Sequence, residues 1–284
     1  MKKIGVLGRG TMASGIIQVM AEKGYEVIMW VRNVDPENPK ASLKNIEKNL
    51  NRNIKKGRLE EEEKEKILGR IYIVTEYEKL EDCDLVIEAI AEDLEIKKET
   101  FKKLDSICKE DTILATNTSS LSITEIASVT NRPDKVIGMH FFNPVSLMKL
   151  VEVIKGIMTS DETNNMVIEL SEKLEKVPVE VEEAPGFVVN RLLIPMINEA
   201  VSILSEGIAN AKAIDEAMKL GANHPMGPLA LADLIGLDVC LAIMDVLYEE
   251  FKDSKYRAHP LMRKMVRGGL LGRKSGKGFH NYSR

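Results

Sequence analysis

The chain has 284 residues, of which 44% are hydrophobic and 30% are charged, and its formal net charge at pH 7 is −4. This length suits two domains, and this balance is typical of a globular protein, which excludes an intrinsically disordered chain. The negative charge argues against nucleic acid as a partner, and no apolar run reaches the ~18 residues that a membrane-spanning helix needs.

The cysteine content argues against disulfides and against a metal site. Cys83, Cys108 and Cys240 are widely spaced and odd in number, and no pair has the spacing of metal ligands. The N-terminus runs at once into an apolar segment, without the longer apolar stretch and cleavage site of a signal peptide. We therefore expect a cytoplasmic protein without a bound metal.

The first predicted strand, Ile4–Leu7, is followed by a glycine-rich turn and a predicted helix near Ser14–Lys23. The turn has the pattern G-x-G-x-x-A: Gly8 permits a tight turn, Gly10 lets the backbone approach a pyrophosphate, and Ala13 allows close helix–strand packing. The helix N-terminus offers N–H groups to phosphates. A plain strand-to-helix turn is the alternative, but the strand–turn–helix context favours a dinucleotide site formed by Gly8, Arg9, Gly10, Thr11, Met12 and Ala13.

The second predicted strand, Glu26–Val31, ends without the carboxylate that usually binds the ribose hydroxyls of NAD. Val31 cannot accept a hydroxyl hydrogen bond, whereas Arg32 can offer paired N–H donors to a 2′-phosphate. We therefore predict that NADP(H) is favoured over NAD(H), with Arg9 over the adenine or near the same phosphate. The alternative is that Arg32 is a solvent-facing charge and that NAD(H) is used.

A long charged stretch, Ala41–Arg70, follows the second strand and is predicted to form a helical hairpin. Lys44 and Lys48 share one helical face, and Glu60–Lys66 mixes acidic and basic residues. The hairpin is either a solvated surface or a basic face for an anionic ligand.

Strands and helices continue to alternate until about residue 181. The further predicted strands are Ile71–Val74, Leu85–Glu88, Thr112–Ala115, Val136–Met139, Leu150–Ile154 and Val177–Val181. The further predicted helices lie near Ala41–Lys56, Ile96–Cys108 and Glu162–Leu174. This alternation predicts an α/β fold with a Rossmann-like, doubly wound, mainly parallel sheet covered on both faces.

Polar residues gather after these strands, where open α/β sheets bind ligands. Asn117 and Ser119 follow one strand, His140 closes the next, and Glu152 lies on the one after that. Hydride transfer between an alcohol and a carbonyl needs a proton donor and acceptor, and an imidazole steadied by a carboxylate suits this role. We predict His140 and Glu152 as this pair; the alternative is a structural, hydrogen-bonded histidine.

The pattern changes after Pro185, beyond which no convincing strand occurs. Apolar residues recur at helical spacing over Phe187–Gly207, Ala211–Leu220 and Leu229–Phe251. We expect a dinucleotide-binding domain over 1–185, with its hairpin insertion at about 41–70, and an all-helical substrate and dimerisation domain over 186–284. The helices are too apolar to stand alone, so a homodimer is expected.

Four motifs extend over nearly the whole chain. They are Asn117-Thr118-Ser119-Ser120-Leu121, His140-Phe141-Phe142-Asn143-Pro144, Pro185-Gly186-Phe187-Val188-Val189-Asn190-Arg191 and His224-Pro225-Met226-Gly227-Pro228. In this order they resemble the motifs of the 3-hydroxyacyl-CoA dehydrogenase family. The length and the ending Gly276-Lys277-Gly278-Phe279 are similar to those of its bacterial 3-hydroxybutyryl-CoA members.

The resemblance implies a role for each matched residue. His140 resembles the catalytic acid/base and Glu152 its orienting partner; Ser119 resembles the contact to the substrate's 3-oxygen and Asn190 the contact to its carbonyl region. Further matched positions around the cofactor are Glu92, Lys97, Ser119 and Asn143, and those for the phosphates of CoA are Arg52 and Lys56. Asn117 is also predicted to bind the cofactor.

The implied reaction is the interconversion of a short-chain (S)-3-hydroxyacyl-CoA and its 3-oxoacyl-CoA. The departures from the family pattern concern the cofactor: Val31 and Arg32 replace the usual ribose-binding acid, and Ala13 replaces a third glycine. Two alternatives are a two-domain dehydrogenase of a free hydroxy acid and a catalytically silent nucleotide-binding module.

Overall fold

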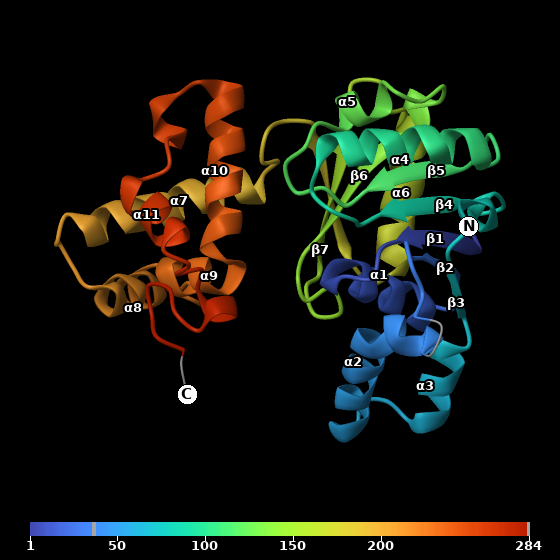
Figure 1. Cartoon of the computed structure of the whole chain (residues 1–284), viewed down its shortest axis with the longest axis horizontal. Coiled ribbons are helices and arrows are strands. Elements are labelled where there is room, and N and C mark those ends of the chain that lie inside the picture. The colour runs from blue at the N-terminus through green and yellow to red at the C-terminus, as the bar shows by residue number, and fades with distance from the viewer. Residues whose placement is uncertain (36–37, 283–284) are drawn as a thin grey trace. The chain divides into compact units, whose positions relative to one another are not determined.

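The structure, a computed structural model, describes residues 1–35 and 38–282. The chain divides into two compact units, Met1–Ala184 and Pro185–Arg284 (Figure 1). Within the described residues, no helix is both long enough and apolar enough to cross a lipid bilayer.

The first unit is built on one eight-stranded sheet with the order β3-β2-β1-β4-β5-β6-β7-β8. Neighbouring strands are parallel except β6 and β7, which are antiparallel. The strands are β1 (Lys3–Leu7), β2 (Glu26–Trp30), β3 (Ile71–Val74), β4 (Leu85–Glu88), β5 (Ile113–Thr116), β6 (Val136–Phe141), β7 (Leu150–Lys155) and β8 (Val177–Glu182). This confirms the predicted mainly parallel α/β fold.

Helices cover the sheet because its central strands are apolar on both faces. In β1, β4 and β5 nearly every residue is buried, as expected for strands packed between two helical layers. Helices α1 (Thr11–Glu22) and α6 (Asp161–Lys173) share one core cluster with alternate strand residues. Helix α5 (Ile123–Ala127) contacts β6 and packs beside α4 (Leu94–Ile107).

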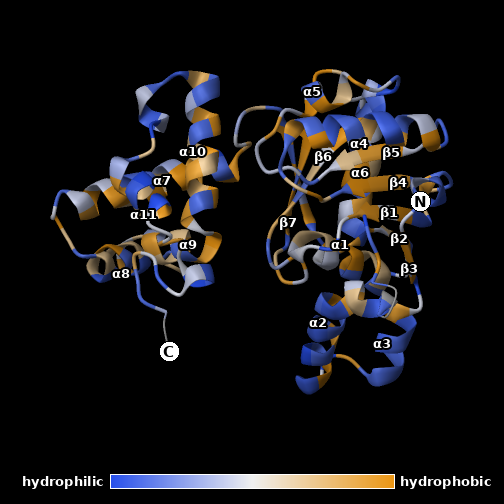
Figure 2. Ribbon diagram, in the orientation of Figure 1, coloured by the Kyte–Doolittle hydropathy of each residue, from blue (hydrophilic) through white to orange (hydrophobic). Residues whose placement is uncertain are grey.

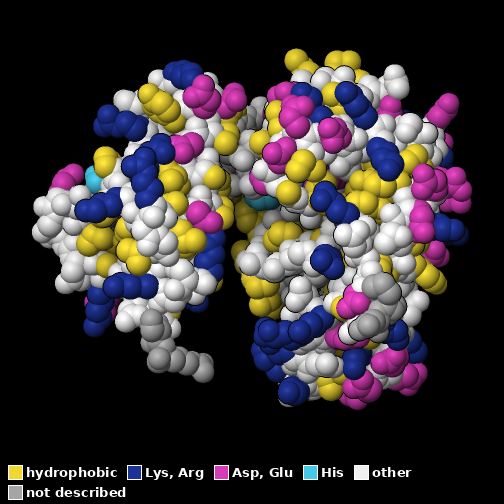
Figure 3. Space-filling view, viewed as in Figure 1, with side chains coloured by type: hydrophobic (Ala, Val, Ile, Leu, Met, Phe, Trp, Pro, Cys, Tyr) yellow, Lys and Arg dark blue, Asp and Glu magenta, His cyan; other side chains and the backbone are white. Residues whose placement is uncertain are grey.

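The charged stretch after β2 folds as two helices, α2 (Lys44–Lys55) and α3 (Glu61–Leu68). Ile46 and Leu50 anchor α2 in the core, so that its other face is turned to solvent. The cations gather over α2, whereas acidic side chains gather over α3 (Figure 3). Helix α2 therefore carries an excess of basic residues and α3 an excess of acidic residues.

The second unit is all-helical, and its helices carry both hydrophobic and hydrophilic residues (Figure 2). Buried apolar residues from these helices form a core of its own. Its helices are α7 (Val189–Ser205), α8 (Ala211–Gly221), α9 (Pro228–Ile235), α10 (Leu237–Phe251) and α11 (Pro260–Arg267). The single helix expected over Leu229–Phe251 is wrong, because Gly236 adopts φ 107° and separates α9 from α10. Short 3₁₀ helices in the chain are Pro39–Leu43, Tyr77–Leu80, Pro133–Lys135, Ser254–Tyr256 and Arg273–Ser275.

Two buried carboxyl groups fasten the C-terminal segment to the second unit. Asp233 accepts hydrogen bonds from the backbone N–H groups of Phe279 and His280, both at 2.9 Å. Asp215 lies 2.6 Å from the Nε2 atom of His280 and also caps α9 by accepting from the Leu229 N–H. These side chains therefore hold the segment together with the isolated β-bridges that Lys277 forms with Gly272 and Asn281.

Candidate active site

The pairing of β6 with β7 places His140 directly opposite Glu152. Opposed residues of an antiparallel pair point to the same face of the sheet, so the register alone brings the two side chains together. The His140 Nδ1 and Glu152 Oε2 atoms are 2.8 Å apart, and the side chains are 8% and 1% exposed. Because a carboxylate only accepts hydrogen bonds, Nδ1 carries the proton of this contact, and proton exchange with a ligand falls to Nε2.

Asn117 is hydrogen bonded to β6, the strand that carries His140. Its Oδ1 atom accepts a hydrogen bond of 2.9 Å from the backbone N–H of Phe141, the residue after His140. The Asn117 N–H in turn donates to the Glu88 carbonyl at 2.8 Å. The ends of β4, β5 and β6 are thereby tied together.

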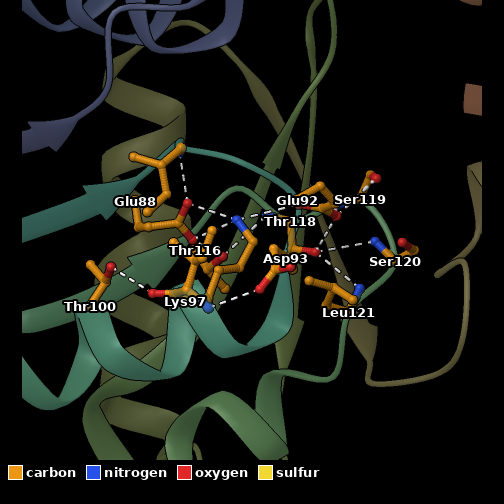
Figure 4. Close-up of polar contacts among 12 residues, drawn as sticks. Glu88, Glu92, Asp93, Lys97, Thr100, Thr116, Thr118, Ser119, Ser120 and Leu121 are labelled. Carbon is orange, nitrogen blue, oxygen red and sulfur yellow. Dashed lines mark hydrogen bonds and ion pairs between the residues drawn. The ribbon is translucent and has the colours of Figure 1, made fainter. Parts of the chain in front are cut away.

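Ser119 lies in the turn after β5, where a carboxyl group from the neighbouring loop holds it (Figure 4). Glu92 Oε1 accepts from the Ser119 N–H at 2.8 Å, from its Oγ at 3.2 Å and from the Thr118 hydroxyl at 2.6 Å. The Lys97 ammonium lies 3.3 Å from Glu92 Oε2. Burial alone would raise the pKa of Glu92, but Lys97 and these hydrogen bonds outweigh it and lower that pKa.

The loop between β1 and α1 requires glycine at its first position. Gly8 has φ 123°, and a Cβ atom there would lie 2.6 Å from the Ala89 carbonyl oxygen. Ala13 is fully buried beneath this turn. A Cβ at Gly10 would meet nothing within 4 Å, so packing within the protein does not require glycine there. The open space above Gly10 fits the close approach of a diphosphate to the backbone.

A cavity of about 710 Å³ opens beside this loop. The predicted cofactor residues Gly8, Arg9, Gly10, Val31 and Arg32 all line it. The other lining residues are Trp30, Asn33, Tyr77, Ala89, Ile90, Ala91, Ile96, Glu99, Thr100 and Lys103. Thr11 is exposed at the start of α1, and Met12 packs against the core.

Aromatic rings and cations form one wall of the cavity. The rings of Trp30 and Tyr77 have their centroids 4.4 Å apart, and the Lys103 ammonium lies 4.1 Å from the Tyr77 centroid. Burial raises the pKa of the Tyr77 hydroxyl, although a hydrogen bond with Thr100 and the nearby Arg32 act in the opposite direction. The described lining residues include three cations, Arg9, Arg32 and Lys103, and one carboxylate, that of Glu99. The excess of positive charge favours an anionic ligand.

The remaining predicted residues belong to α2 and its end, to the loop after β6 and to α7. Arg52 and Lys56 are exposed, in the last turn of α2 and just after it. Asn143 is exposed two residues after β6. Asn190, 9% exposed, lies in the first turn of α7 in the second unit.

Three residues around the site escaped the sequence analysis. Glu88 and Thr116 are fully buried at the ends of β4 and β5 and hydrogen bond to each other at 2.7 Å. Lys103 reaches the cavity from α4. A carboxylate that ends an otherwise apolar strand was the available signal for Glu88, whereas nothing distinguishes Lys103 from the other lysines of α4.

Two family models divide the chain between them. The model described as 3-hydroxyacyl-CoA dehydrogenase, NAD binding domain, matches residues 3–184, and that described as the C-terminal domain matches residues 186–282. The 3-hydroxybutyryl-CoA dehydrogenase of Clostridioides difficile is 60% identical over 282 residues, which cover 99% of this chain and 100% of the relative.

A more distant relative and a solved structure are also similar to this chain. The mitochondrial hydroxyacyl-coenzyme A dehydrogenase of Homo sapiens is 43% identical over 99% of this chain and 91% of its own length. The crystal structure of (S)-3-hydroxybutyryl-CoA dehydrogenase from Ralstonia eutropha is similar with a TM-score of 0.95 at 50% identity, covering 100% of both chains.

Proposed function

The chain belongs to the 3-hydroxyacyl-CoA dehydrogenase family, and from this premise we propose that it interconverts (S)-3-hydroxybutyryl-CoA and acetoacetyl-CoA with a nicotinamide cofactor. The observation that carries the proposal is the 2.8 Å contact between the buried His140 and Glu152 side chains. Two relatives that are 60% and 57% identical over 99% of this chain bear the names 3-hydroxybutyryl-CoA dehydrogenase and probable 3-hydroxybutyryl-CoA dehydrogenase, which supports the short acyl chain.

His140 moves the proton of this reaction. With Nδ1 held by Glu152, the Nε2 atom exchanges a proton with the substrate's 3-oxygen, and the Glu152 carboxylate stabilises the imidazolium form. When bound, the nicotinamide accepts or supplies the hydride at substrate C3. Ser119 orients the 3-oxygen and Asn190 the thioester carbonyl, which lowers the barrier by fixing the reacting geometry.

An assay with two substrates tests the proposed reaction. The purified protein is mixed with acetoacetyl-CoA or with free acetoacetate, and loss of reduced-nicotinamide absorbance is followed. We expect turnover of the thioester and none of the free acid. Equal turnover of free acetoacetate would indicate a hydroxy-acid dehydrogenase, and no turnover of either would leave a silent nucleotide-binding module.

The cofactor is proposed to be NADP(H) rather than NAD(H). The cavity at the end of β2 carries Arg32 where a ribose-binding carboxylate would be needed for NAD, and Arg9 and Lys103 add two further cations. A 2′-phosphate gains charge-assisted hydrogen bonds in such a cavity. NADPH use favours reduction of acetoacetyl-CoA. Comparison of kcat/KM for NADPH and NADH tests this point, and a preference for NADH would refute it.

The CoA part of the substrate is proposed to bind at Arg52 and Lys56. Both side chains are exposed at the end of α2, where the cations of the hairpin gather. CoA is a polyanion and the protein is net acidic, so a local basic site is needed.

A homodimer formed by the helical unit is also proposed. This unit exposes large apolar side chains, among them Leu192 at 70%, Ile208 at 69% and Leu220 at 85%. Exposed apolar side chains of this size are typical of a protein–protein interface. Sedimentation velocity tests the proposal, and a monomer at micromolar concentration would contradict it.

The cytoplasm is the proposed compartment. Cys83, Cys108 and Cys240 are all buried free thiols. Free thiols in a protein of this size are typical of a reducing compartment, in which disulfides do not persist. Fractionation of the native cells tests this assignment.

A further inference from the structure

Glu88 is a fully buried carboxyl group at the end of β4. Its Oε1 atom accepts from the Ile90 N–H at 2.8 Å and from the Lys97 ammonium at 2.7 Å. Its Oε2 atom accepts from the Lys97 ammonium at 2.8 Å and from the Thr116 hydroxyl at 2.7 Å. Both oxygens are therefore hydrogen bonded twice, and Lys97 is bound by both.

One chain of contacts runs from Glu88 through Lys97 to Ser119 (Figure 4). Lys97 is 1% exposed and lies 3.3 Å from Glu92, which accepts hydrogen bonds from the Ser119 N–H and hydroxyl. Lys97 is closer to Glu88 than to Glu92. Glu88 thus keeps the ammonium nearer to itself, and Glu92 Oε1 accepts hydrogen bonds from Thr118 and Ser119.

A second chain of contacts runs through Thr116 to the same turn. The Thr116 hydroxyl, which donates to Glu88, accepts from the Thr118 N–H at 3.2 Å. The Thr118 hydroxyl then accepts from the backbone N–H of Leu121 at 3.0 Å. The two chains of contacts start at one carboxyl group and meet in the turn that carries Ser119.

Such a buried ion pair contributes little net free energy to folding. Removing a carboxylate and an ammonium from water costs several kcal/mol per ion, and packed apolar residues often serve a core at least as well. A buried pair of this kind is therefore better explained by the geometry that it imposes on its neighbours, and here the neighbours are Glu92, Thr118 and Ser119.

We propose that Glu88 is a positioning residue that fixes Ser119 for its contact with the substrate's 3-oxygen. This inference rests on the proposed function, because it needs Ser119 to act in the reaction. Without the Glu88 charge, Lys97 moves toward Glu92 and draws its carboxylate away from the serine. The substitution should then lower kcat, since misplacement of an orienting group reduces the stabilisation of the transition state.

A double-mutant cycle between Glu88 and Ser119 tests the proposal. We expect Glu88→Gln to lower kcat for acetoacetyl-CoA about tenfold, with little change in KM for the thioester. In the Ser119→Ala background the same substitution should lower kcat less than about twofold, because its target hydroxyl is gone. An equal loss of kcat in both backgrounds, or no loss in either, would overturn the proposal.

Two further variants separate positioning from stability. Should Glu88→Gln fail to fold, Thr116→Val cuts only the second chain of contacts, and the same cycle is run with it. Asp105→Asn removes a comparable carboxylate that pairs with Arg132 at 2.7 Å, away from this turn, and should lower the Tm but leave kcat within about twofold. A wild-type protein without turnover refutes the proposed function itself, whereas an active wild type with unaffected variants refutes only the role of Glu88.

Discussion

At the scale of single residues, the site depends on where a few polar side chains sit on otherwise apolar strands. His140 alternates with Met139 and Phe141, which point into the core shared with α1 and α6. The opposite face therefore carries the imidazole, together with Glu152 from β7. A buried imidazole with a fixed partner keeps one tautomer and one orientation, which a proton-transferring group needs.

Arg32→Asp tests the cofactor assignment at one residue. The new carboxylate can accept the ribose hydroxyls of NADH and repels a 2′-phosphate. We expect kcat/KM for NADPH to fall about a hundredfold and that for NADH to rise, so that the preference reverses. Lys102→Asp changes the charge equally on an exposed position of α4 and should leave the ratio unchanged. Parallel losses with both cofactors would contradict the assignment.

The chemistry of individual residues was easier to predict than the network around them. His140 and Glu152 follow from the need for an acid/base and its partner. Glu88 does not, because its partners Lys97 and Thr116 come from other elements, 9 and 28 residues away. Only the placement of α4 and β5 against β4 turns an acidic strand end into the centre of a hydrogen-bond network.

At the scale of elements, α2 combines an anchored and a basic face. Ile46 and Leu50 fix it to the core, and Lys44, Lys48 and Arg52 follow one another at intervals of four on the exposed side. Residues four apart share one face of a helix. The helix thus presents aligned cations that a polyanionic ligand can use.

Removing two cations at the C-terminal end of α2 should weaken substrate binding without changing the chemistry. We expect the Arg52→Ala, Lys56→Ala double variant to raise KM for acetoacetyl-CoA about tenfold and to leave kcat unchanged, because the phosphates of CoA are remote from C3. The effect should shrink at high salt. Lys66→Ala, on the acidic helix α3, is the matched control. An unchanged KM in the double variant would exclude this helix as the CoA site.

The C-terminal segment depends on close contact with Asp233. A Cβ atom at Gly278 would lie 1.9 Å from the Asp233 Oδ1 atom, whereas one at Gly221, the last residue of α8, meets nothing within 4 Å. Gly278→Ala should therefore lower the free energy of unfolding by about 1–3 kcal/mol. Gly221→Ala should leave it within about 1 kcal/mol. Denaturant titration compares them, and equal midpoints would contradict the close contact.

Most strands were predictable because they are short apolar runs bounded by polar residues, whereas β8 alternates valine with proline or glutamate. The antiparallel direction of β7 was harder to predict from the sequence, although the eight residues 142–149 are too few for the connection between two parallel strands. The break at Gly236 was missed because apolar periodicity continues across it from α9 to α10. Helix α5 has only five residues, too few to show a helical period.

At the scale of the whole molecule, both units keep their thiols away from solvent. Burial raises the pKa of Cys83 to about 12 and that of Cys108 to about 11 in the first unit. Burial likewise raises the pKa of Cys240 to about 12 in the second. The reactive thiolate is therefore scarce in each folded unit.

Alkylation should then report unfolding of either unit. At about pH 8, iodoacetamide should leave the native protein unmodified and label all three cysteines in denaturant, since a protonated buried thiol is a poor nucleophile. Mass spectrometry locates the label. Rapid labelling of Cys240 alone in native protein would mean that the helical unit opens by itself.

The proposed reaction depends on His140 as the group that moves the proton, and His140→Ala tests this role most directly. We expect kcat for acetoacetyl-CoA with NADPH to fall by about a thousandfold or more, because the proton of the 3-oxygen has no other carrier. Binding of NADPH, measured by its fluorescence, should remain within about twofold of wild type, since His140 does not line the cavity proposed to hold the cofactor. Turnover close to that of wild type in this variant would exclude His140 as the group that moves the proton.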